Sequence, residues 1–271
     1  MLPSFIRTTK AQILKPALWH FTIYASWDYG DPMYDTPAAN AAFRKRFEAL
    51  LAAGGLPKTS VGLKMMAPRE FPFASGAPSQ LVSMVLNTAA GDGAEYLYQV
   101  NDDTHMDSKG WAPVLVAKLK ENTLVPNLGV TGPRDTVMPR IFTHVFVHRT
   151  HFEIFGYLFP PAFKNWWSDD WISHVYGSSN TFVHSHAQVT HKTAAQKTTI
   201  KSERYIVDTK DGDKLETEVR KGAVIIKQWF ASHGVDAPLH VTCGYTTPED
   251  ANPMLHDSVA AHAASETHRD F

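Results

Sequence analysis

Cysteine is nearly absent from the sequence, with one residue, Cys243, among 271. A single thiol cannot build an intrachain disulfide framework, and cysteine-poor chains are typical of reducing compartments. An excess of charge of one sign is absent too, because 26 basic residues oppose 27 acidic ones and the formal net charge is −1. The sequence therefore offers no basic surface for nucleic acid, and we expect no nucleic-acid partner.

Long apolar runs are also missing. No run reaches the roughly 18–20 residues that a membrane-spanning helix requires, and the opening MLPSFIRTTKAQILKPALW lacks the apolar core of a signal peptide. We therefore expect no membrane span and a cytoplasmic location, with the Golgi lumen as the alternative if the sequence is part of a longer, anchored protein. The composition, 44% hydrophobic and 20% charged, is that of a globular chain with a sizeable core.

Strand-like and helix-like segments alternate along the first half of the chain. Repeated strand–loop–helix units predict an α/β fold, in which a mostly parallel central sheet is flanked by helices in a single domain. The predicted strands are 18–25, 60–67, 94–100 and 127–133, and the predicted helices are 37–55, 78–93 and 108–122. The second half is expected to hold a strand that turns helical at Thr150 (140–156), a helix entered at Ser168 (160–177), a strand pair (180–191) and a helix (215–234).

A pair of aspartates, Asp102 and Asp103, ends the predicted strand AEYLYQV. A single aspartate in that place commonly ends a strand and caps the next helix. Two adjacent carboxylates repel each other, and Mg²⁺ or Mn²⁺, which bridge carboxylates to substrate phosphates, would balance them. Both interpretations stay open. Because ligands bind beyond the carboxyl ends of such strands, Asp28 and Asp31 are expected on the same rim.

A second acidic pair, Asp169 and Asp170, lies in NWWSDDWIS. These residues could cap a helix and place favourable charge in its first turn. They could also accept a proton from a sugar hydroxyl while a neighbouring aromatic ring stacks on the sugar. The aromatic residues concerned are Trp166, Trp167 and Trp171.

The segments YQVNDDT and SDDW, in this order, resemble the two acidic motifs of nucleotide-sugar glycosyltransferases of the GT-A type, notably the exostosin-like and fringe-like families. The string from GVTGPRD to ISHVYG is similar to glycosyltransferase-like proteins of algae, protists and the large viruses that infect algae. The resemblance covers roughly residues 18–210. It implies a GT-A-like fold over 1–234, with a nucleotide-binding half at about 18–107, an acceptor-binding half at about 108–234 and a C-terminal tail at 235–271.

The resemblance also implies roles for individual residues. Asp103 would bind the metal and Asp102 the donor ribose or sugar, while Asn101 stands where the family has an acidic residue. Asp170 would be the catalytic base, with Asp169 as an acceptor-binding residue or second candidate. A late histidine usually completes the metal shell, and the candidates in order are His191, His184 and His186. The donor candidates are Tyr24, Asp28, Asp31, Asn87 and Asp102, and the acceptor candidates are Trp166, Trp167, Trp171 and Asp135.

Three further histidines, His144, His148 and His151, have spacings that suggest zinc. No HExxH pattern and no cysteine ligand accompanies them. We therefore rank structural or acceptor-contact roles above a zinc site.

The expected function is transfer of a sugar, with xylose favoured, from a UDP-sugar to a hydroxyl of a glycan or glycoprotein oligosaccharide. In an inverting transfer one base deprotonates the acceptor, and Mn²⁺ or Mg²⁺ neutralises the charge that develops on the diphosphate. Two alternatives stay open: a metal-dependent phosphoesterase, and a non-catalytic carbohydrate-binding protein on the same scaffold. The sequence does not predict an oligomeric state.

Overall fold

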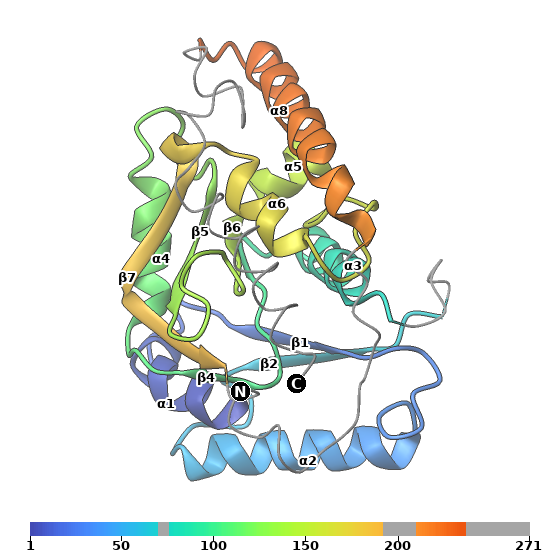
Figure 1. The fold of residues 1–271 in the computed structure, drawn as a ribbon. Coiled ribbons are helices and arrows are strands. Elements are labelled where there is room, and N and C mark those ends of the chain that lie inside the picture. The colour runs from blue at the N-terminus through green and yellow to red at the C-terminus, as the bar shows by residue number, and fades with distance from the viewer. Residues whose placement is uncertain (70–75, 192–209, 237–271) are drawn as a thin grey trace.

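The computed structural model describes residues 1–69, 76–191 and 210–236. These residues form a mixed α/β domain with two strand systems (Figure 1). A parallel pair consists of β1 (Thr22–Ser26) and β2 (Gly62–Met66). A larger, curled sheet has the order β3-β6-β5-β7-β4, built from β3 (Tyr96–Tyr98), β4 (Thr104–Met106), β5 (Val130–Asp135), β6 (Phe146–His148) and β7 (Thr181–His191).

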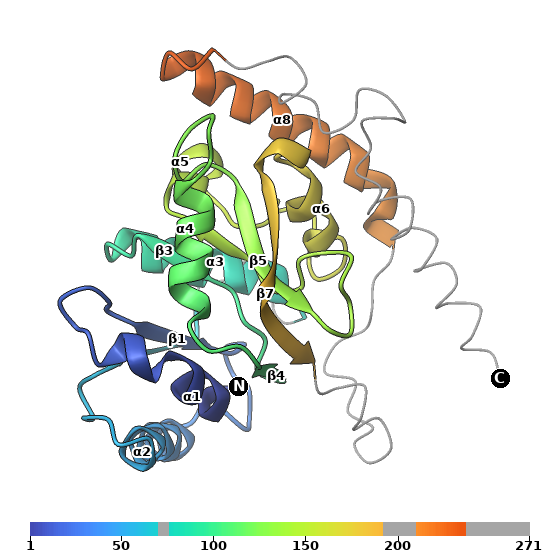
Figure 2. The same cartoon turned by 90° about the vertical axis from the view of Figure 1, so that its left-hand side faces the viewer.

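Helices flank both strand systems. In both views α1 and α2 lie beside the β1–β2 pair, whereas α8 lies at the opposite end of the domain (Figures 1 and 2). Among the described residues, no helix has the length and apolar character needed to cross a membrane. The helices are α1 (Leu2–Ile13), α2 (Pro37–Ala53), α3 (Pro78–Gly91), α4 (Trp111–Lys120), α5 (Thr150–Phe155), α6 (Ser168–His174) and α8 (Leu215–Ser232), with 3-10 turns η1 (Ser178–Asn180) and η2 (Lys210–Lys214).

The prediction of a mostly parallel sheet is wrong. Within the described residues, β1–β2 and β5–β7 pair in parallel, but β3–β6, β5–β6 and β4–β7 pair antiparallel. The chain between β5 and β6 contains no helix. A parallel connection usually needs a crossover of a dozen or more residues, commonly helical, so this short connection returns the chain antiparallel.

The larger sheet separates two hydrophobic cores. Successive side chains of β6 alternate between them, because Phe146 packs with the cluster under α1, α2 and α4 and Val147 with the cluster under α3, α5, α6 and α8. Figure 2 shows α4 on one side of β5 and β7 and α6 on the other. Both faces of the sheet are therefore covered, and the sheet edges and strand ends remain for a site.

Most of the predicted elements are confirmed within a few residues. The expected cap of α2 is present, because the Thr36 hydroxyl accepts a hydrogen bond from the Ala39 amide at 3.1 Å. Pro113 lies in the first turn of α4 (Trp111–Lys120), where the missing amide proton costs little. The expected tail at 235–271 lies outside the described residues from residue 237 onward.

Three predictions of elements are wrong or incomplete. The expected strand pair at 180–191 is one strand, β7, with a register shift opposite Pro133 and Arg134 in β5. No strand was predicted between the acidic pair and the helix 108–122, but the short strand β4 lies there, before α4 begins. The helix α1 was not predicted. Its buried positions include Ser4, Thr8 and Thr9, so its inward face does not form an uninterrupted apolar stripe.

Close packing between α8 and α6 depends on Gly222. A methyl group at this position would overlap Val175 Cγ2 and lie 3.3 Å from the ring of Trp171. We expect Gly222→Ala to lower the free energy of unfolding by about 1–3 kcal/mol, since neither neighbour can yield inside a packed core.

The matched control is Gly91→Ala at the end of α3, where an added methyl meets no atom within 4 Å. Urea denaturation of both variants measures the difference. A Gly222→Ala protein as stable as the Gly91→Ala protein would contradict the packing.

Candidate functional site

The acidic segment after β3 lies against the end of β7. Thr104 in β4 pairs with His191 in the strand register, which brings the two ends of these strands together. The Asn101 side-chain nitrogen lies 3.2 Å from His191 Nε2. Residues that are 90 positions apart in the sequence therefore share one corner of the larger sheet.

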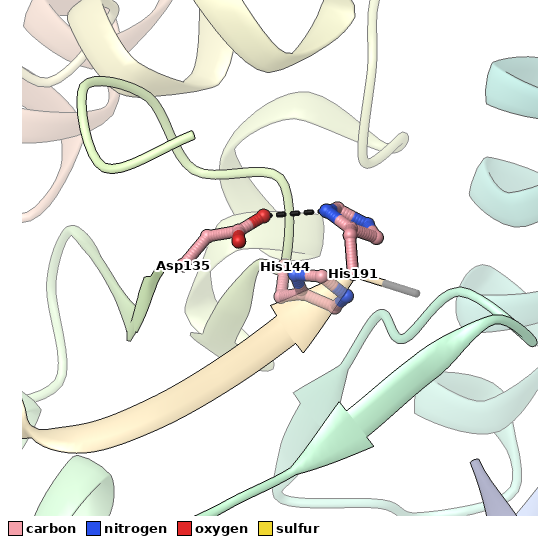
Figure 3. A group of neighbouring side chains, drawn as sticks. All are labelled: Asp135, His144 and His191. Carbon is pink, nitrogen blue, oxygen red and sulfur yellow. Dashed lines mark ion pairs between the residues drawn. The ribbon is translucent and has the colours of Figure 1, made fainter. Parts of the chain in front are cut away.

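Asp135, the last residue of β5, holds the other side of the His191 ring (Figure 3). Its Oδ2 lies 2.5 Å from His191 Nδ1, and Oδ1 accepts a hydrogen bond from the Val137 amide at 2.9 Å. The Thr143 hydroxyl donates to the same Oδ2 at 2.7 Å. Burial raises the pKa of Asp135, but these hydrogen bonds and the charge of His191 together bring it below the usual range. Asp135 is therefore an anion that fixes the proton of His191 on Nδ1.

His144 belongs to the same network and is neutral. Thr143 donates its only proton to Asp135, so its oxygen accepts the His144 Nδ1 proton at 2.9 Å. His144 Nε2 then accepts from the Thr104 hydroxyl at 2.5 Å. Burial lowers the pKa of His144 to about 3. Both ring nitrogens are occupied, which leaves no lone pair of His144 for a metal.

Asp135, His144 and His191 are close enough together to suggest a three-ligand metal site. The hydrogen bonds argue against that arrangement, since the carboxylate and both nitrogens of His144 already have partners. Of the ring nitrogens in this group, only His191 Nε2 faces away from Asp135 and His144, toward the Asn101 amide. A carboxylate that holds the Nδ1 proton of a histidine commonly orients its Nε2 toward a metal.

Asp103 supplies a second candidate ligand at this corner. Its Oδ1 is buried and has no hydrogen-bond partner, which is costly for a carboxylate oxygen. A divalent cation would satisfy it, and one carboxylate with one imidazole is a donor set that Mn²⁺ accepts. Asp103 and His191 therefore offer the donor atoms that a divalent cation accepts, and the charge of Asp103 acts on His191, where it raises the pKa.

The charge around His191 is negative. Burial lowers its pKa, while the hydrogen bond to Asp135 and the charges of Asp135, Asp103 and Asp169 raise it, and the net shift is upward. A proton on Nε2 would face the Asn101 amide protons, donor against donor, so the hydrogen-bond pattern favours the neutral ring. The same acidic field that favours a proton also favours a divalent cation.

The second acidic pair opens α6 near this corner. The Ser168 hydroxyl accepts from Ser79 of α3 at 2.9 Å, and the Ser173 hydroxyl accepts from the Phe142 amide at 2.9 Å, which fixes this helix against its neighbours. Trp167, just before the helix, has a left-handed backbone with φ of 70°, which is uncommon for a bulky residue.

Asp169 and Asp170 differ in their surroundings. Asp169 is half-buried, whereas Asp170 is 1% exposed. Burial and then the charge of Asp170 raise the pKa of Asp169 to about 7, against an opposing effect of His191. A carboxyl group with a pKa near 7 can exchange a proton at neutral pH.

The predicted acceptor residues fall into two groups. Trp171 is 0% exposed and donates its indole proton to the Glu218 carbonyl, so its face is not available to a sugar. Asp135 is 2% exposed and holds His191, which also argues against an acceptor contact. Trp166 and Trp167 are half-buried and keep part of their surface accessible.

The predicted donor residues are not all brought together. Asp28 accepts a hydrogen bond from the Gly76 amide at 3.3 Å, beside the N-terminal end of α3 that meets α6. Asp31 accepts from the amides of Met33 and Tyr34, which is the loop-capping role. Asp102 is exposed, in the turn that carries Asp103.

Tyr24 and Asn87 lie toward the other end of α3. The Tyr24 hydroxyl donates to Asp92, the residue that follows this helix, at 2.6 Å. Asn87 lies on the exposed face of the C-terminal half of the helix. Neither residue is positioned with the acidic segment in this structure.

His184 and His186 do not complete the metal shell with Asp103. The His186 amide donates to His184 Nδ1 at 3.2 Å, and His184 pairs with Pro133 in β5. Burial, then the charges of His186 and of Lys118 in α4, lower the pKa of His184. Seven residues of strand, roughly 20 Å, separate His184 from His191.

Sequence reasoning missed the residues that support His191. Gln99 bonds Asn101, and Thr143 bonds Asp135. Neither residue belongs to a sequence motif, because both roles depend on contacts between distant segments. His144 was noticed for its spacing to His148 and His151, but its partners are threonines. His148 bonds the Thr150 hydroxyl at 2.7 Å, and His151 contacts Tyr176 in the core. No three of these described histidines converge on one point.

The chain matches no protein-family model, no curated protein and no solved structure.

Proposed function

We propose that the protein is a metal-dependent, inverting glycosyltransferase of the GT-A type that uses a UDP-sugar, with xylose as the first candidate sugar. The acceptor is a hydroxyl of a glycan or glycoprotein oligosaccharide. One observation carries the proposal: the acidic turn after β3 contacts His191 Nε2 through Asn101, the charge of Asp103 in that turn raises the pKa of His191, and Asp135 orients the ring. The acidic first turn of α6 lies within electrostatic reach of the same histidine.

The residues of this corner would hold Mn²⁺ or Mg²⁺ between Asp103 and His191. Bound there, the cation supplies charge neutralisation to the diphosphate that departs in the transfer. Asp102, which is exposed in the same turn, would bind the donor ribose or sugar. Asp28, near the N-terminal end of α3, is the donor candidate best placed for the nucleotide.

Asp169 is the stronger candidate for the catalytic base, with Asp170 as the second. A base must reach the acceptor hydroxyl and be deprotonated at working pH. Asp169 is half-buried and its pKa is raised to about 7, whereas Asp170 is almost fully enclosed. Trp166 and Trp167 lie directly before this turn, where an aromatic face could stack on an acceptor sugar.

A thermal-shift experiment tests this function. Ligands that bind only the folded protein raise its melting temperature. We expect UDP or a UDP-sugar with Mn²⁺ to raise it by a few degrees, and either component alone to raise it less. Asp103→Ala should abolish the joint effect, whereas the control Asp92→Asn, at an exposed ion pair, should keep it.

Two results would contradict the proposal. No shift with any nucleotide at millimolar ligand and metal would remove the donor site and leave a carbohydrate-binding protein. Release of phosphate from phosphate esters, abolished by Asp103→Ala in the absence of transfer to any glycan, would identify a phosphoesterase.

A further inference from the structure

The Nε2 lone pair of His191, which the proposed cation needs, is already occupied by Asn101. Distances alone do not establish which atom donates, because amide nitrogen and oxygen can be exchanged by a half-turn of the side chain. Here a backbone amide fixes the direction. The Val145 amide must donate, so the atom of Gln99 that faces it at 3.3 Å is the oxygen, Oε1.

The direction is transmitted to His191 through two amides. Gln99 Nε2 donates to Asn101 Oδ1 at 2.7 Å, and Asn101 Nδ2 then donates to His191 Nε2 at 3.2 Å. From the other end, the anionic Asp135 holds the His191 proton on Nδ1. The Val145 amide at one end and Asp135 at the other both require that His191 Nε2 carries no proton. The donors and acceptors are therefore consistent along the whole chain of hydrogen bonds.

A cation and the Asn101 amide compete for that lone pair. A metal bound to an imidazole nitrogen lies roughly 2.1 Å from it, whereas the amide nitrogen lies 3.2 Å from the same atom. A cation in line with the lone pair would overlap the amide. Asn101 therefore has to turn away when the cation binds.

Asn101 cannot become a ligand simply by rotating its amide. Its nitrogen would then face Gln99 Nε2, and two donors would oppose each other. Turning Gln99 as well would deprive the amide of Val145, a fully buried residue, of its acceptor. Gln99 thus holds Asn101 in the orientation that blocks the metal position.

We propose that Asn101 is a positioning residue that keeps the lone pair of His191 directed and satisfied in the metal-free protein and must be displaced by the cation, so that it sets the cation affinity. The inference rests on the metal site of the proposed function. Displacement costs one hydrogen bond, which corresponds to a roughly two- to tenfold weaker cation affinity than the same site would have without the amide.

Mn²⁺ titration, followed by calorimetry or by the EPR signal of free Mn²⁺, tests the inference without any enzymatic readout. We expect Asn101→Ala to bind Mn²⁺ two- to tenfold more tightly than the unmodified protein. Asn101→Asp should bind more tightly still, because it adds a negative oxygen. The matched control Gln228→Ala, which removes an exposed amide of α8, should not change the affinity.

The outcomes separate this inference from the proposed function. Unchanged or weaker binding by Asn101→Ala, with Mn²⁺ binding by the unmodified protein that Asp103→Ala abolishes, overturns the role of Asn101 and keeps the metal site. Absence of binding by both proteins at millimolar Mn²⁺ removes the metal site and this role with it. Binding that appears only in Asn101→Ala supports the blocking role most strongly.

Discussion

Replacing Asp135 with asparagine should lower both the stability of the protein and its affinity for Mn²⁺. Asp135 is a buried anion that accepts hydrogen bonds from His191, Thr143 and the Val137 amide. Hydrogen bonds to a charged group contribute about 1.5–3 kcal/mol each, and asparagine weakens the three that Asp135 accepts. Without the carboxylate, the proton of His191 is no longer confined to Nδ1, and loss of such a second partner typically weakens metal binding about 10- to 100-fold.

Urea denaturation and Mn²⁺ titration below the melting temperature measure the two effects separately. Asp92→Asn is the matched control, because Asp92 is an exposed carboxylate that pairs with Lys64 at 2.6 Å, and little change is expected. An Asp135→Asn protein that binds Mn²⁺ as tightly as the unmodified protein would show that His191 is not a ligand oriented by Asp135.

Replacing Asp169 with asparagine should reduce the rate of sugar transfer by about 10²–10⁴-fold. Binding of the UDP-sugar and Mn²⁺ should persist, because Asp169 is proposed to act on the acceptor. Burial and the charge of Asp170 raise the pKa of Asp169 to about 7 without a cation. A base acts in its deprotonated form, so the rate should fall as the pH decreases, with the midpoint at or below pH 7 since a bound cation lowers this pKa.

Asp170→Asn distinguishes the two aspartates. The charge of Asp170 raises the pKa of Asp169, so its removal should move the acid side of the pH–rate profile to lower pH while transfer continues. If transfer instead disappears in Asp170→Asn and survives in Asp169→Asn, then Asp170 is the base and the assignment to Asp169 is wrong.

Local patterns in the sequence were sufficient for most helices and for the two acidic turns. Thr36 before Pro37 predicted the start of α2, and the apolar run before Asp102 predicted the position of β3. These signals are contained in a few consecutive residues, where propensity and capping decide the structure.

Properties that depend on contacts between distant segments could not be predicted in the same way. The direction of β6 follows from the short connection between β5 and β6, which returns the chain antiparallel. The prediction of a mostly parallel sheet was therefore wrong. The tryptophans look alike in NWWSDDWIS, yet Trp171 lies on the inward face of α6 and its side chain is buried. The acceptor role predicted for Asp135 does not hold, because Asp135 binds His191. The two residues are 56 positions apart in the sequence, and only the β5–β7 pairing brings them together.

Pulsed EPR of bound Mn²⁺ tests most directly whether Asp103 and His191 hold one divalent cation. We expect a nitrogen coupling from one imidazole in the unmodified protein. The coupling should disappear in His191→Gln and persist in the control His186→Gln, an exposed histidine on the same strand. Bound Mn²⁺ without nitrogen coupling, or a coupling that survives in His191→Gln, would contradict the site.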